Sequence, residues 1–244
     1  MTHSSLEYAR ANRERHLAEL LDFLRLPSIS TDPAHREATA DTAAWLAEQM
    51  KAAGLENVRV IPTERHPLVY ADWLHAGPGA PTALIYGHYD VQPVDPLELW
   101  TTPPFEPSVR EDYIYARGAA DDKGQLYIHV KAVETTLRAD GRLPLNVKFL
   151  IEGEEEIGSH NLHAFIPQNR DLLAANSALI SDSAMLGPGQ PALVYGLRGN
   201  CHVLLDITGP DRDLHSGTYG GSIDNPLNVL GHLLARLKNE FGHV

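Results

Sequence analysis

The feature that most constrains the fold is a succession of short, β-rich apolar runs that alternate with helical patterns. The runs are bounded by Pro or Gly and lie at residues 57–61, 67–73, 81–87, 145–153 and 177–182. Helical patterns precede or separate them at about residues 36–53, 124–138 and 159–168. Strands that alternate with helices are typical of an α/β sheet.

Local signals set the expected limits of several elements. Leucines spaced as i, i+3, i+4 and i+7 predict that the chain opens with one amphipathic helix ending near Leu26. Gly54 favours a left-handed cap after the second helix, and Pro226 near a first helical position predicts a final helix. Further short strands are predicted near 113–115 and at 191–196 and 201–207.

Composition excludes several classes of protein. The chain has 244 residues, 43% of them hydrophobic, and 32 acidic against 20 basic side chains give a net charge of −12. The apolar fraction argues against disorder, and the acidity without a basic cluster excludes nucleic acid as a partner. No apolar run reaches the roughly 18 to 20 residues of a membrane span, so no membrane partner is expected. The polar N-terminus and the single cysteine, Cys201, predict a cytoplasmic location.

Acidic side chains and histidines follow four of the predicted strands. His88 and Asp90 follow the run at 81–87, Asp121 and Asp122 follow the strand near Tyr115, Glu154, Glu155 and Glu156 follow the run at 145–153, and Asp182 ends the last run. Each alone has an ordinary explanation, such as a helix cap or a solvated face. Ligands of α/β sheets collect where strands end, and clustered carboxylates repel each other unless a cation lies between them. Together these residues predict a metal site.

The types of ligand narrow the choice of metal. Oxygen ligands alone suit Mg²⁺ or Ca²⁺, whereas an added imidazole favours Zn²⁺, Mn²⁺ or Co²⁺. One histidine among several carboxylates fits a pair of zinc-like ions, with manganese or cobalt as alternatives. Two such ions share a carboxylate and serve the hydrolysis of amides or phosphates.

Five motifs, in order, resemble the M20 family of co-catalytic metallopeptidases, and within it the cytosolic non-specific dipeptidase and carnosinase group. They are GHYDVQP (87–93), RGAADDKG (117–124), EGEEEIGS (152–159), LISD (179–182) and YGLRGN with DLHSGTYGGS (195–222). The resemblance implies a mixed sheet flanked by helices, of the zinc-dependent exopeptidase type. Residues 1–190 would be the N-terminal part of the catalytic domain. Residues 191–244 would begin an inserted α+β dimerisation, or lid, domain.

The resemblance also implies metal ligands, residue by residue. His88 and Asp182 would hold one zinc ion, Asp121 would bridge both ions, and Glu156 would hold the other. The family needs one more ligand, a histidine near the C-terminus of a chain about twice this long. His243 is not a credible substitute, so we expect the chain to be a fragment of a longer protein. The alternatives are a second polypeptide that supplies the missing part, and a chain that has lost activity.

Other roles follow from the same resemblance. Glu155 would be the general base, Asp90 would orient His88, and His215 would reach the active site of the partner subunit in a homodimer. The family has a cis peptide bond where this chain has Asp121-Asp122. The implied activity is hydrolysis of dipeptides or other small peptides. The alternatives are a deacylase of the same superfamily that acts on N-acyl amino acids, and a non-catalytic metal-binding fragment.

Overall fold

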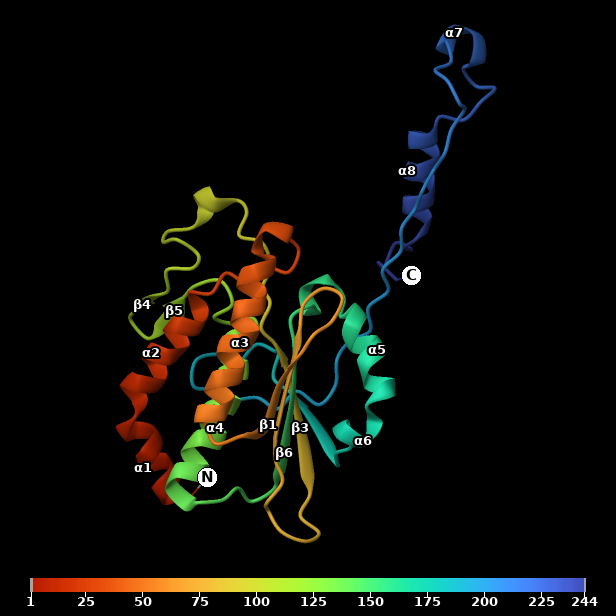
Figure 1. Cartoon of the computed structure of the whole chain (residues 1–244). Coiled ribbons are helices and arrows are strands. Elements are labelled where there is room, and N and C mark those ends of the chain that lie inside the picture. Colours follow the sequence, from red (N-terminus) through yellow and green to blue (C-terminus); the bar gives the residue numbers. More distant parts are fainter. Residues whose placement is uncertain (1, 244) are drawn as a thin grey trace. The chain divides into compact units, whose positions relative to one another are not determined.

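The computed structural model describes residues 2–243 and divides into two compact units, Met1–Ala192 and Leu193–Val244 (Figure 1). The first unit contains the main sheet and both apolar cores. The second contains, among its described residues, two helices joined by irregular segments. Each unit is described below by itself.

A mixed five-stranded sheet forms the centre of the first unit. Its strands are β1 (Glu56–Ile61), β2 (Leu68–Trp73), β3 (Thr82–His88), β6 (Asn146–Glu152) and β7 (Ser177–Ile180), in the order β1-β2-β6-β3-β7. The pairs β1–β2 and β2–β6 are antiparallel, and β6, β3 and β7 are parallel. This confirms the predicted α/β class and mixed sheet. In the β3–β6 register His88 lies beside Glu152, so the two parallel strands end at the same end of the sheet.

Helices cover both faces of this sheet (Figure 1). The helices of one face are α1 (His3–Ala11), α2 (Arg13–Leu24), α3 (Arg36–Ala52) and α4 (Lys123–Asp140), and those of the other are α5 (His160–Gln168) and α6 (Arg170–Leu173). Side chains alternate along β2, so Val69 packs with the first group and Tyr70 with the second. Burial on both faces explains why the central strands read as nearly continuous apolar runs.

Three local features differ from the sequence predictions. The opening helix is two helices, because Asn12 leaves helical geometry at φ −105° and ψ 12°. The strand near Tyr115, β5 (Tyr113–Tyr115), pairs with β4 (Ser108–Arg110) in a separate two-stranded sheet. Asp121 therefore comes from the loop before α4 and not from the end of a strand of the main sheet. Short 3₁₀ turns complete the unit: η1 (Pro33–His35), η2 (Leu97–Leu99) and η3 (Glu155–Ile157).

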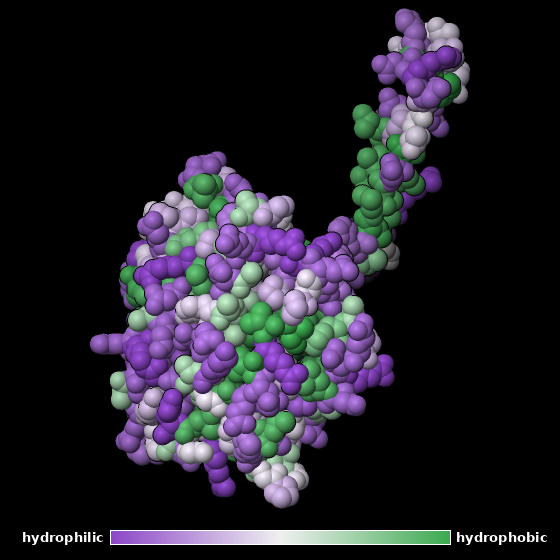
Figure 2. Space-filling view, viewed as in Figure 1, coloured by the Kyte–Doolittle hydropathy of each residue, from purple (hydrophilic) through white to green (hydrophobic). Residues whose placement is uncertain are grey.

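The second unit corrects one prediction and confirms another. The strands predicted at 191–196 and 201–207 are wrong, since both segments are irregular along the described residues. A strand needs a hydrogen-bonded neighbour, and Leu193, Tyr195 and Leu204 are largely exposed. Figure 2 shows hydrophobic residues at the surface of this unit. The predicted last helix forms as α8 (Pro226–Arg236), and α7 (Ser216–Tyr219) precedes it. Among residues 2–243 no helix is long and apolar enough to cross a membrane.

Candidate metal centre

Three predicted ligands meet at the end of β3. His88 is completely buried, and its Nε2 lies 3.0 Å from Asp121 Oδ1 and 3.8 Å from Asp182 Oδ2. One ligand atom from each residue lies within 4.8 Å of the other two, and both aspartates are exposed. One imidazole nitrogen and two carboxylate oxygens, open to solvent on one side, are a donor set that suits a zinc-like ion.

Asp90 connects His88 to the turn that carries the glutamates. Its Oδ1 lies 3.3 Å from His88 Nδ1, on the side of the ring away from the cluster. Its two oxygens also accept hydrogen bonds from the backbone N–H groups of Glu155 and Glu156, each at 3.2 Å. Asp90 is fully buried. One carboxylate therefore contacts both the imidazole, for which the resemblance implies an orienting role, and the backbone of η3, a contact that the sequence did not predict.

The loop before α4 places Asp121. The Asp121-Asp122 peptide bond is cis, which confirms the expectation from the resemblance. Asp122 points inward, and its Oδ2 accepts a hydrogen bond from His88 N at 3.2 Å. The buried Lys123 donates to the Leu26 carbonyl at 2.7 Å, beyond the end of α2. A Cβ at Gly124 would lie 2.1 Å from the Ala119 carbonyl oxygen, so only glycine fits there.

Glu155 and Glu156 lie in η3, at the same end of the sheet. Neither contributes an atom to the three-residue cluster found in the described chain. Burial raises the pKa of Glu155, and the charges of Asp182, Asp90 and Asp121 raise it further, against the opposing effect of His88. Burial also raises the pKa of Glu156, while a hydrogen bond from Gln92 lowers it. A raised pKa is what a general base near neutral pH requires.

The electrostatics of the cluster show that it attracts positive charge. Burial would lower the pKa of His88, but Asp90, Asp122 and Glu155 raise it to about 10. Burial raises the pKa of Asp122 to about 7, and the charges of Asp182 and Asp121 add to this effect. Crowded carboxylates thus retain protons, which a divalent cation would replace.

Sequence reasoning missed two contacts beside these ligands. Gln92 Nε2 donates a hydrogen bond to Glu156 Oε2 at 2.7 Å. His129, on α4, lies 2.6 Å from the hydroxyl of Ser181, the residue before Asp182. Gln92 could have been found by extending the alternation of His88 and Asp90 by one step. Nothing in the sequence pairs His129 with Ser181, because 52 residues separate them.

His215 lies in the second unit, where it caps α7. Its Nδ1 accepts a hydrogen bond from Gly217 N at 3.1 Å. The ring is therefore held against its own backbone, with Nε2 left to act as a donor.

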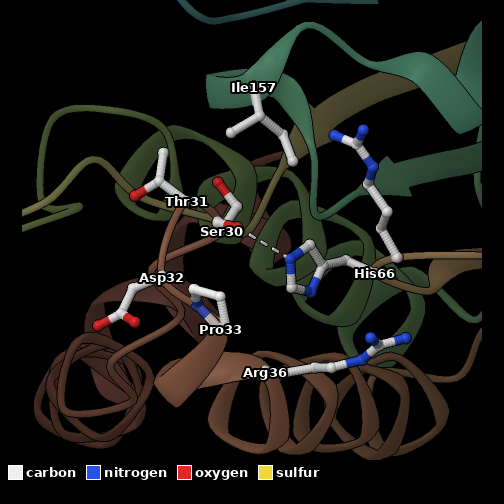
Figure 3. Close-up of a pocket in the computed structure, with 8 residues that line it drawn as sticks. Ser30, Thr31, Asp32, Pro33, Arg36, His66 and Ile157 are labelled. Carbon is white, nitrogen blue, oxygen red and sulfur yellow. Dashed lines mark hydrogen bonds between the residues drawn. The ribbon is translucent and has the colours of Figure 1, made fainter.

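A cavity of about 380 Å³ lies on another part of the first unit (Figure 3). It is lined by Ser30, Thr31, Asp32, Pro33, Arg36, Arg65, His66 and Ile157. His66 lies at its centre, and its Nε2 is 3.1 Å from the Ser30 carbonyl oxygen. None of the predicted ligands lines this cavity, so the cavity is separate from the three-residue cluster of His88, Asp121 and Asp182.

Comparisons with known proteins agree with the fold and the motifs. The model of peptidase family M20/M25/M40 matches residues 84–224. Beta-Ala-His dipeptidase of Mus musculus is 32% identical over 97% of this chain and 51% of its own. Cys-Gly metallodipeptidase DUG1 of Saccharomyces cerevisiae is 30% identical over 95% of this chain and 51% of its own.

Solved structures of two peptidases superpose on nearly the whole of this chain. Human carnosine dipeptidase 1 superposes with a TM-score of 0.77 and 28% identity, over 98% of this chain and 53% of that one. The M20 family metallo-carboxypeptidase Sso-CP2 from Sulfolobus solfataricus has a TM-score of 0.73 and 36% identity, over 94% and 51%. The chain spans about half the length of the curated relatives it matches.

Proposed function

The chain belongs to peptidase family M20/M25/M40, and from this premise we propose that it supplies the metal-binding half of a dipeptidase. The observation that carries the proposal is the meeting of His88, Asp121 and Asp182 within 4.8 Å. Relatives named as dipeptidases and metallodipeptidases support the substrate class, a dipeptide or another short peptide. Residues 1–190 are proposed as part of the catalytic domain and 191–244 as the start of the lid.

The proposed metals are two divalent ions, zinc first, with manganese or cobalt as alternatives. His88 and Asp182 would hold one, Glu156 the other, and Asp121 would bridge them. When bound, the ions would polarise the scissile carbonyl and make a water molecule acidic near neutral pH. The imidazole and carboxylate donors support this assignment.

Glu155 is proposed as the general base. Its carboxylate takes a proton from the attacking water and delivers it to the nitrogen of the leaving amine as the peptide C–N bond breaks. Its raised pKa and its backbone, held by Asp90, support this role. His215 of a partner subunit in a homodimer is proposed to donate a hydrogen bond to the developing oxyanion, an interaction worth about 3 kcal/mol.

The test combines metal analysis with a substrate panel. The native protein, freed of metal and titrated with Zn²⁺, is expected to bind two ions per chain and, once loaded, to hydrolyse unmodified dipeptides. Acetylated and succinylated amino acids form the second half of the panel. Hydrolysis of the acylated compounds alone would replace the dipeptidase by a deacylase, and binding without any hydrolysis would leave a non-catalytic metal protein.

A further inference from the structure

From the last residue of β3 onward, every second residue contacts the proposed metal centre or the turn beside it. His88 contributes Nε2 to the three-residue cluster. Asp90 contacts the ring of His88 and the backbone of Glu155 and Glu156. Gln92 contacts the side chain of Glu156. The intervening Tyr89 and Val91 are fully buried. The segment 88–92 thus aligns three polar side chains along one side.

The contact of Gln92 leaves half of the Glu156 carboxylate available. Gln92 Nε2 donates to Oε2 at 2.7 Å, so Oε1 carries no bond from this amide. Asp90 Oδ2 accepts from Glu156 N at 3.2 Å at the same time. Glu156 is therefore held at both its backbone and its side chain by residues two positions apart. A restrained carboxylate loses less rotamer entropy when it binds a cation.

The chemistry of an amide suits this position. A lysine or arginine here would form an ion pair with Glu156 and compete with a cation for its negative charge. The neutral amide donates one hydrogen bond and leaves the charge in place. Partners of this kind orient ligands in metal sites, and their loss weakens metal binding by about 10- to 100-fold.

We propose that Gln92 is a positioning residue that orients the carboxylate of Glu156 toward the second metal ion. The inference rests on the proposed dinuclear centre, to which it adds a residue. Gln92 touches neither His88 nor Asp182 among the hydrogen bonds of the described chain. It therefore acts on one of the two ions only.

The experiment compares Gln92→Leu with the wild-type protein by titration with Co²⁺, followed by calorimetry and by the visible absorption of the bound ion. The first equivalent is expected to bind with unchanged affinity and spectrum. The second is expected to bind about tenfold more weakly, with altered absorption bands. Gln92 is exposed, so the melting temperature of the metal-free protein should not change. Gln168→Leu, at the exposed end of α5, is the matched control.

Each outcome has a separate meaning. Two ions in both proteins, with equal affinities, would overturn the role of Gln92 and leave the dinuclear centre intact. A single ion in the wild-type protein would overturn the dinuclear centre, and the role of Gln92 with it. A loss of affinity for both equivalents would also contradict the proposal, since it would indicate a general distortion of the site.

Discussion

At the scale of single residues, buried acids do most to organise the metal centre. Asp90 holds His88 and the turn of Glu155 and Glu156 together, and Asp122 accepts from the backbone of His88. Hydrogen-bond partners of metal-ligating residues set the orientation and the basicity of those ligands. The residues proposed to touch the metal are the buried His88, two exposed aspartates and a half-buried glutamate. The contacts of Asp90 and Asp122 hold His88 and the backbone of that glutamate in place.

The role of Glu155 gives a prediction at this scale. Glu155→Gln keeps the size and shape of the side chain but removes the proton acceptor. Turnover of a dipeptide by the loaded native protein should fall below a tenth of the wild-type rate, because general-base catalysis contributes about 10²- to 10⁴-fold. Zn²⁺ stoichiometry should remain unchanged. A variant with a larger residual rate would assign the base to another residue.

At the scale of elements, α4 connects the site to the helices that cover the sheet. Its first residue, Lys123, donates hydrogen bonds to the carbonyls of Phe23, in the last turn of α2, and of Leu26, just beyond it. The middle of α4 carries an ionic network. In that network Glu134 accepts from Arg15 at 2.5 Å and from Lys131 at 2.7 Å, and Lys131 also pairs with Glu19. The side chain of Glu134 is only 6% exposed, so its charge depends on these partners.

This network predicts acid sensitivity. Burial alone would raise the pKa of Glu134, but Arg15 and Lys131 lower it below its usual value. Its stabilising contribution is therefore present above about pH 4.5 and is lost as the pH falls through the lowered pKa. Glu134→Gln should lower the free energy of unfolding by about 2 kcal/mol at pH 7, and by less at pH 3, where protonation of Glu134 has begun to remove its ion pairs. Urea denaturation at both pH values measures this difference.

The control is a salt bridge of similar geometry on the surface. Glu48 pairs with Lys51 at 2.7 Å, but its side chain is 68% exposed. Glu48→Gln should change the free energy of unfolding by less than about 0.5 kcal/mol, because solvent screens exposed pairs. Equal losses in the two variants would show that the buried network adds no more than an ordinary surface pair.

At the scale of the whole molecule, the two units differ in how much of the apolar core and of the proposed metal site they contain. The sheet, both apolar cores and all four proposed metal ligands lie within Met1–Ala192. Leu193–Val244 has no buried apolar residue among those described. A segment without buried apolar surface gains little free energy from folding.

A truncated chain tests whether the second unit contributes to the stability and metal binding of the first. A protein of residues 1–192 should unfold with a free energy within about 1 kcal/mol of the 244-residue chain, since it keeps both cores. It should also bind Zn²⁺ with the same affinity for the first equivalent. Chemical denaturation and calorimetry provide the two measurements. A large loss of stability would mean that the second unit packs on the first and contributes to its core.

The sequence alone determined the α/β class, the limits of most strands and helices, and the acidic and histidine residues that follow the strands. Apolar periodicity and Pro or Gly boundaries are local, so the strand β2 and the helix α3 could be predicted from their own residues. The motif order further implied the roles of His88, Asp121 and Asp182.

Only the tertiary structure decided which of these side chains meet, and how they are held. The pairs Gln92–Glu156 and His129–Ser181 join residues 64 and 52 positions apart, and no local pattern encodes such distances. The irregular segments at 191–196 and 201–207 make the same point, because their β-rich sequences lack a pairing strand in the described chain. Local patterns set what a segment can form, whereas pairing between distant segments decides what it does form.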